Sequence, residues 1–215
     1  MQSERIYLVW AHPRHDSLTA HIADAIHQRA MERKIQVTEL DLYRRNFNPV
    51  MTPEDEPDWK NMDKRYSPEV HQLYSELLEH DTLVVVFPLW WYSFPAMLKG
   101  YIDRVWNNGL AYGDGHKLPF NKVRWVALVG GDKESFVQMG WEKVSAPSVT
   151  SCDGCPVWQQ SRPSILMDTN DEFSDSKRYH RLSLLFARRI TSKIRRAIIC
   201  PGYRPAVRSQ SFHYS

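Results

Sequence analysis

Short hydrophobic runs alternate along the first two thirds of the chain with stretches in which hydrophobic residues recur every three or four positions. The runs are rich in Val, Ile and Leu, which predicts strands buried on both faces of a parallel sheet. The stretches between them predict amphipathic helices. The expected strands are residues 5–10, 35–42, 82–87 and 123–129, and the expected helices begin near residues 17, 68 and 95.

Local signals support this division. Ser17 and Ser67 can each cap a helix, and Pro68 suits a first helical turn. The second helix is expected to bury Val70, Leu73, Tyr74, Leu77 and Leu78. Residues 35–42 alternate only in part, which favours the edge of the sheet, and the polar residues 43–67 predict a long surface excursion. The alternation of strands and helices predicts an α/β fold, a doubly wound parallel sheet with helices on both faces.

The composition is that of a globular chain, with 42% hydrophobic and 25% charged residues among 215, enough for one α/β domain. No apolar run approaches the roughly 18 residues of a membrane span, and no leader-like segment precedes the first strand. We therefore expect no integral membrane segment and no signal peptide. Three Cys do not form a closed disulfide framework, so a cytoplasmic location is expected.

Charge and cysteine content divide the chain near Val144. Residues 1–144 carry a formal charge of −3, from 17 Lys and Arg against 20 Asp and Glu, whereas residues 145–215 carry +6, from 11 against 5. All three Cys lie in the second segment, together with many Ser, Pro and Arg. We therefore divide the chain into a body, residues 1–144, and an atypical basic tail, residues 145–215, which is expected to be partly disordered.

Three loops are expected to meet at one edge of the sheet, because the carboxyl ends of its parallel strands open on the same side. The first loop, residues 10–19, runs into a helix amino terminus, whose backbone N–H groups suit an anion such as phosphate. Further donors in this loop are His12, Arg14, Ser17 and Thr19. The loop lacks the glycine patterns of dinucleotide-binding folds and of ATPases.

The other two loops suit a flat ring. Residues 88–92, Pro-Leu-Trp-Trp-Tyr, offer a rigid backbone and aromatic walls. Gly130 and Gly131 allow the backbone of the third loop to approach a ligand closely. A phosphate-binding turn, a flat apolar wall and a close backbone together predict a site for a flavin nucleotide.

These residues resemble the flavodoxin-like NAD(P)H:quinone oxidoreductases. The resemblance lies in Ala-His-Pro and Ser after the first strand, Phe-Pro-Leu-Trp-Trp-Tyr at 87–92, the helix Pro-Ala-Met-Leu-Lys-Gly-Tyr-Ile-Asp-Arg-Val-Trp at 95–106, Gly-Leu-Ala-Tyr at 109–112 and Gly-Gly at 130–131. It covers residues 4–143 and is closest to the bacterial branch of modulator-type quinone reductases and of ancillary subunits of potassium efflux systems.

The resemblance implies a flavodoxin-like homodimer that binds FMN or FAD non-covalently and passes hydride from NAD(P)H to quinones or similar small acceptors. Carried over by position, it implies cofactor contacts from His12, Ser17, Leu18, Thr19, Pro88, Leu89, Trp90, Trp91, Tyr92, Gly130 and Gly131. Trp90 and Tyr92 are expected beside the ring, with backbone N–H groups of residues 89–91 at its polar edge. No catalytic residue is assigned, since the redox chemistry belongs to the flavin.

The sequence also departs from the family. Leu128-Val129 stands where a Thr pair is frequent, and Phe136 and Trp141 stand near positions that hold a Tyr and a His in some members. Beyond Lys143 the family pattern ends, which leaves the fifth strand and the last helix open. Residues 165–167 are a short candidate strand, and residues 179–199 are a candidate helix with a basic face.

Several alternatives remain open. The aromatic residues 90–92 could belong to the core or to a dimer interface. Cys152 and Cys155 form a C-x-x-C, but no second pair completes a metal site, so no metal is expected. His15, His21 and His27 are expected to face solvent. A solvated helix face accounts for the basic residues of 179–199, so no nucleic-acid partner is expected.

Two further hypotheses concern the whole chain. The missing Tyr and His favour a regulatory ancillary subunit that docks on a potassium-efflux-type transporter. The abrupt change near Val144 suggests a shift of reading frame, with a genuine but divergent tail as the alternative. A shifted frame could leave the sheet without its fifth strand and the product without function.

Overall fold

The computed structural model describes residues 4–130, residue 138 and residues 161–168. These residues form strands and helices in alternation. In chain order they are β1 (Arg5–Trp10), α1 (Leu18–Glu32), β2 (Gln36–Asp41), α2 (Pro68–Leu78), β3 (Thr82–Pro88), α3 (Ala96–Val105), β4 (Lys122–Gly130) and β5 (Ser161–Asp168). The elements predicted from the sequence within residues 5–130 are all present, with boundaries that differ by one or two residues.

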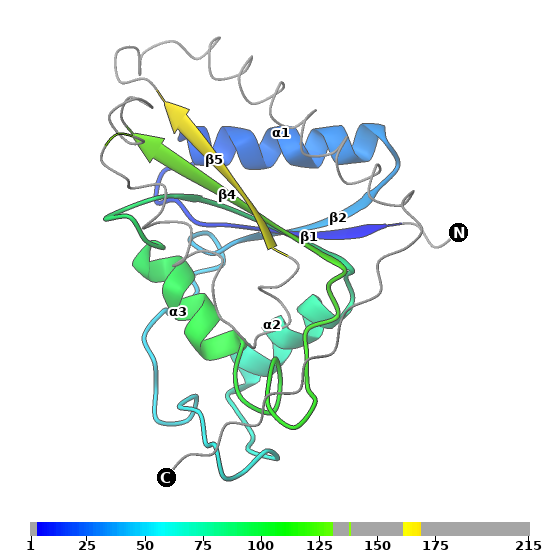
Figure 1. Ribbon diagram of the computed structural model, residues 1–215, viewed down its shortest axis with the longest axis vertical. Helices are drawn as coiled ribbons and strands as arrows, with labels where there is room; N and C mark the ends of the chain where they lie inside the picture. The colour runs from blue at the N-terminus through cyan, green and yellow to red at the C-terminus, as the bar shows by residue number, and fades with distance from the viewer. Residues whose placement is uncertain (1–3, 131–137, 139–160, 169–215) are drawn as a thin grey trace.

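The strands form one sheet in the order β2-β1-β3-β4-β5, and every neighbouring pair is parallel. Helix α1 covers one face of this sheet, and α2 and α3 cover the other (Figure 1). This arrangement confirms the flavodoxin-like α/β fold with helices on both faces. Strand β2 lies at an edge, as its partial alternation predicted.

Strand β5 supplies the fifth strand that the sequence left open. It runs beside β4 from the pair Val123–Ser161 to the pair Gly130–Asp168. It contains the candidate strand 165–167 but begins at Ser161 and includes Pro163. Proline lacks an N–H group and is tolerated at a sheet edge, which β5 occupies within the described residues. The frame-shift hypothesis allowed for a sheet without this strand, but the strand is present, and the hypothesis itself stays a prediction.

Other expectations beyond β4 lie outside the described residues. They concern Gly131, Phe136, Trp141, the Cys152–Cys155 motif and the candidate helix 179–199. The division of the chain at residue 144 stays a prediction.

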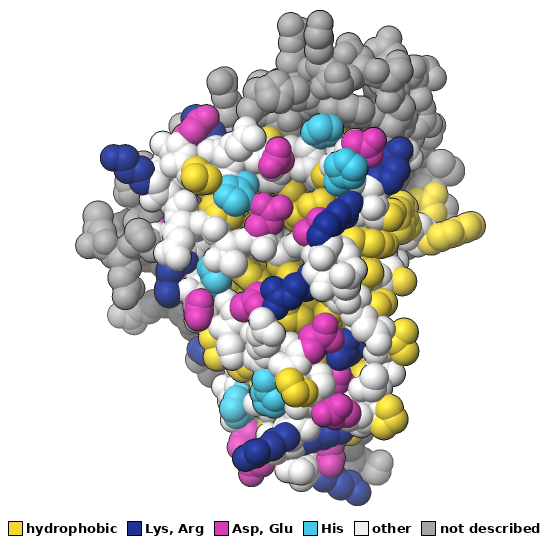
Figure 2. Space-filling model, turned by 180° about the vertical axis from the view of Figure 1, so that it is seen from behind, with side chains coloured by type: hydrophobic (Ala, Val, Ile, Leu, Met, Phe, Trp, Pro, Cys, Tyr) yellow, Lys and Arg dark blue, Asp and Glu magenta, His cyan; other side chains and the backbone are white. Residues whose placement is uncertain are grey.

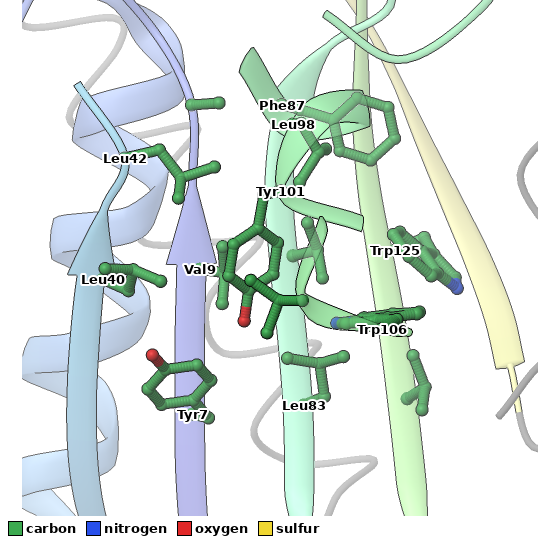
Figure 3. Close-up of a cluster of buried hydrophobic side chains, with 14 of the residues drawn as sticks. Tyr7, Val9, Leu40, Leu42, Leu83, Phe87, Leu98, Tyr101, Trp106 and Trp125 are labelled. Carbon is green, nitrogen blue, oxygen red and sulfur yellow. The ribbon is translucent and has the colours of Figure 1, made fainter. Parts of the chain in front are cut away.

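Alternation along β1 divides the core between the two faces of the sheet. Tyr7 and Val9 pack with residues of α2 and α3, whereas Ile6, Leu8 and Trp10 pack with α1. The first of these clusters is largely aromatic where the strands meet α3. Figure 3 shows its rings and branched side chains gathered between the sheet and α3, with Tyr7, Tyr101, Trp106 and Trp125 among those labelled. The large buried area on both faces fixes the sheet, whose carboxyl ends carry the loops of interest.

Both predicted serine caps are present. Ser17 Oγ accepts the Ala20 N–H at 3.2 Å, and Ser67 Oγ accepts the Val70 N–H at 3.4 Å. One prediction for α2 is wrong, since Leu78 is 46% exposed. It is the last helical residue, and it lies about 100° around the axis from the fully buried Leu77, so it points away from the sheet.

The excursion at residues 43–67 is held by a buried ion pair. Arg104 of α3 donates to Asp55 Oδ2 from Nε at 3.0 Å and from Nη2 at 2.7 Å. Asp55 also accepts the Ser67 N–H at 2.8 Å. Burial alone raises the pKa of Asp55, but hydrogen bonds from Ser67 and Arg104 outweigh it and hold the pKa below its ordinary value. The excursion is therefore fastened to the helix that follows the aromatic loop.

Candidate functional site

A cavity of about 640 Å³ opens at the carboxyl ends of β1, β3 and β4. Its size is within the range of small-molecule sites. Among the described residues, every predicted site residue except Tyr92 lines it, and Gly131 lies outside the described residues. The lining residues are His12, Arg14, Ser17, Leu18, Thr19, Pro88, Leu89, Trp90, Trp91, Leu128, Val129 and Gly130. The three loops predicted to meet at this edge therefore surround one space.

The amino terminus of α1 forms one end of this cavity. The first intrahelical hydrogen bond runs from the His21 N–H to Ser17 O at 3.0 Å. The N–H groups of Leu18 and Thr19 precede that bond, so they remain as donors at the positive end of the helix dipole. Both residues line the cavity. This end has the donor chemistry that a phosphate requires.

His12 adds a ring to the same end. Its Nδ1 lies 3.1 Å from the Arg14 backbone N–H, and its ring centroid lies 5.9 Å from that of Trp90. Nδ1 also lies 3.1 Å from Arg14 O, so the neutral ring has two tautomers: one accepts the Arg14 N–H and carries its proton on Nε2, and the other donates from Nδ1 to Arg14 O. Burial lowers the pKa of His12 and outweighs the Arg14 backbone hydrogen bond, which raises it, and the charges of Arg14 and Arg44 lower it further. At neutral pH this ring is therefore uncharged.

The aromatic loop, which also lines the cavity, makes a tight turn. The Ser93 N–H donates to Trp90 O at 3.0 Å, and the two residues between them have positive φ, 49° at Trp91 and 58° at Tyr92. This is the pattern of a type I′ turn, which normally favours Asn and Gly. Side chains at positive φ strain the backbone, by about 1–3 kcal/mol per residue. Trp91 is nevertheless 94% exposed, so burial of its ring does not offset this cost.

Two details differ from the expectations for this loop. The Leu89 N–H donates to Leu128 O at 2.7 Å, so it extends the sheet and is not available to a ligand. Trp90 is bridged to Ser93, so the N–H group of Trp91 remains as the candidate donor there. Tyr92 does not line the cavity, because its partly buried ring packs against the core.

The third wall comes from the end of β4. Leu128 and Val129 line the cavity beside Gly130, although the sequence marked them only as a departure from the family. A Cβ added to Gly130 would meet no described atom within 4 Å. Packing among the described residues therefore does not require glycine at position 130. The residue lines the cavity, so an added side chain would have open space beside it.

Arg44 is a residue near this site that the sequence did not identify. It follows β2, and its guanidinium donates to the backbone carbonyls of His12 and Pro13 at 2.7 and 3.0 Å. No sequence signal marks it, because its partners are main-chain atoms 31 and 32 positions away.

The described residues contain no group of three or more His, Cys, Asp or Glu that could hold a metal ion. His15 is exposed, whereas His27 is bonded through Nδ1 to Glu39 at 2.7 Å. Figure 2 shows basic, acidic and His side chains intermingled over one face of the described part. No helix there is long and apolar enough to cross a membrane. The cavity, rather than a broad charged surface, is the candidate site.

A protein-family model described as a flavodoxin-like fold matches residues 4–151. The chain belongs to this flavodoxin-like family. It is 34% identical over 143 residues to an "Uncharacterized NAD(P)H oxidoreductase" of Haemophilus influenzae, covering 63% of this chain and 69% of that protein. It is 32% identical over 158 residues to NAD(P)H dehydrogenase (quinone) 1 of Rattus norvegicus, covering 65% of this chain and 58% of that protein. The predicted family resemblance is confirmed.

Solved structures share the fold. An NAD(P)H:quinone oxidoreductase from Methanothermobacter marburgensis aligns with a TM-score of 0.78 and 23% identity, over 90% of this chain and 98% of that one. Some further structures of this flavodoxin-like fold are complexes with FMN. The chain spans 55–69% of the length of curated relatives that it matches.

Proposed function

We propose that this chain is an oxidoreductase that binds FMN or FAD in the cavity and passes hydride from NAD(P)H to a quinone or a similar small acceptor. The observation that carries the proposal is the single cavity that joins the α1 amino terminus to the strained, exposed aromatic turn. The names of the relatives in Haemophilus influenzae and Rattus norvegicus support the reaction class.

The residues present fit a flavin nucleotide. The N–H groups of Leu18 and Thr19, with the neutral His12 ring, bind the phosphate by hydrogen bonds without needing a cationic partner. Beside these donors, the Trp90 and Trp91 rings provide flat apolar walls, and the Trp90 ring lies 5.9 Å from the His12 ring.

When bound, the flavin supplies the hydride chemistry. The protein's part is to orient the ring, exclude water and stabilise charge. The Trp91 N–H group is the donor in this loop that would stabilise negative charge at the ring edge. Leu128 and Val129 offer only apolar side chains on the third wall, so they exclude water and supply no proton.

Anaerobic reduction tests the proposal. The purified chain is loaded with FMN or FAD and mixed with NADH or NADPH, and then with a soluble quinone. We expect the visible flavin absorbance to bleach with the nucleotide and to return with the quinone. A folded chain whose bound flavin is bleached by neither nucleotide would contradict the proposed reaction.

We also propose that the chain works as a cytoplasmic homodimer, as the family resemblance implies. Sedimentation of the flavin-loaded protein and fractionation of cells test these two points. The described residues offer no observation that favours docking on a transporter.

A further inference from the structure

Arg44 joins the end of β2 to the loop that follows β1. Its guanidinium donates from Nη1 to His12 O at 2.7 Å and from Nη2 to Pro13 O at 3.0 Å. These are consecutive carbonyls in the loop between β1 and α1. A planar fork with two donors at fixed spacing matches such a pair, which a single ammonium group does not. Arg44 does not itself line the cavity.

The guanidinium is held from its other sides. Asp41 pairs with Nη1 at 3.3 Å, and the indole of Trp10 lies 5.4 Å from the guanidinium carbon. Asp41 Oδ1 also accepts the backbone N–H groups of Tyr43 and Arg44, at 3.0 and 3.2 Å. The base of the Arg44 side chain is thereby fixed to the carboxyl ends of β1 and β2. The two carbonyl bonds then transmit that position to the loop.

We propose that Arg44 is a positioning residue for the phosphate end of the cavity, an inference that rests on the proposed flavin nucleotide site. By holding the carbonyls of His12 and Pro13, it orients the His12 ring and the turn that leads into Leu18 and Thr19. The same fork keeps these carbonyl oxygens, which would repel a phosphate, engaged away from the anion. Its role is geometric, so a Lys at this position keeps the charge but loses the function.

Paired ligands separate this role from general stability. FMN and riboflavin differ only by the phosphate, so each is titrated into the wild-type chain, Arg44→Lys and Arg44→Ala. We expect both variants to lose about ten-fold in FMN affinity, the loss of roughly one charge-assisted hydrogen bond. Riboflavin affinity should stay unchanged. The matched control is Arg45→Lys, because the Arg45 guanidinium pairs with Glu76 at 2.9 Å and not with the carbonyls of His12 and Pro13.

Hydrogen exchange of residues 12–17 in the flavin-free protein gives an independent readout. We expect faster exchange in both Arg44 variants and no change in Arg45→Lys. Wild-type FMN affinity in Arg44→Lys would overturn the geometric role, and equal losses for FMN and riboflavin would reduce it to general stability. If the wild-type chain binds neither ligand, the proposed function fails. Unchanged exchange in Arg44→Ala would overturn the positioning role by itself.

Discussion

Trp91 combines two properties that do not stabilise the folded state. Its ring is 94% exposed, and its φ of 49° lies in a region unfavourable for a large side chain. Asn tolerates this region, so Trp91→Asn should leave stability unchanged or raise it by up to about 1 kcal/mol. FMN affinity should fall about ten-fold, because a flat wall is lost. Thermal unfolding and flavin titration measure the two effects. Destabilisation with unchanged FMN affinity would assign this ring to the fold instead.

Ser17 has two roles that one substitution separates. Ser17→Ala removes the bond to the Ala20 N–H and should destabilise the chain by about 1 kcal/mol. It should also weaken FMN binding, since the first turn of α1 loses order, while the reduction potential of the bound flavin stays nearly unchanged. The matched control is Ser67→Ala, which removes the cap of α2. If Ser67→Ala weakens FMN binding equally, the effect of Ser17 is global stability and not the phosphate end.

His12 gives the site a pH dependence with a defined sign. Burial lowers its pKa below the ordinary value of 6.5. His12 therefore binds a proton near pH 6.5 in the unfolded chain but only at a lower pH in the folded chain. Stability therefore falls as the pH drops from 6.5 to the lowered pKa. His12→Gln should remove part of this loss. Urea unfolding of both proteins between pH 7.5 and about 5 measures it, and identical pH profiles would show that His12 is not desolvated.

At the scale of elements, α3 is fixed by its close packing on the excursion. A Cβ at Gly100 would overlap Pro49 O and lie 2.5 Å from Pro49 Cβ. Ala is normally the better helix former, but here Gly100→Ala should destabilise by about 1–3 kcal/mol through overpacking. A suitable control is Lys99→Ala, on the exposed face of the same helix. Denaturant unfolding measures the free energy of unfolding of each variant. A more stable Gly100→Ala would show that residues 43–67 shift to accommodate the added Cβ.

The sequence predicted elements where a local rule applied. Ser17 and Ser67 marked the helix starts because a side-chain oxygen satisfies an otherwise free N–H nearby in the chain. Leu78 was placed wrongly because helical spacing does not show where the sheet ends beneath the helix. Arg44 was missed because its carbonyl partners carry no side-chain signature. Tyr92 was expected beside the ring, with the core left as an alternative, because only the turn at residues 90–93 decides which ring points inward.

At the scale of the molecule, strand order brings the site together. The carboxyl ends of β1 and β3 are neighbours, with β4 next to β3, so loops some 70 and 40 residues apart in sequence meet around one cavity. This meeting followed from the parallel alternation alone. Strand β5 could not be foreseen in the same way, because Ser161–Asp168 pairs through its backbone and its sequence lacks a long apolar run. The strand conformation of these residues is stabilised by pairing with β4 and not by their local strand propensity.

The central claim is that one flavin nucleotide occupies the cavity at the carboxyl edge of the sheet. The most direct measurement is FMN or FAD titration into the purified full chain, followed by hydrogen exchange with and without the flavin. We predict saturable binding with protection at the amino terminus of α1, residues 18–20, and at the Trp90–Trp91 backbone. A folded chain that binds neither flavin, or that binds one with protection elsewhere, would contradict the claim.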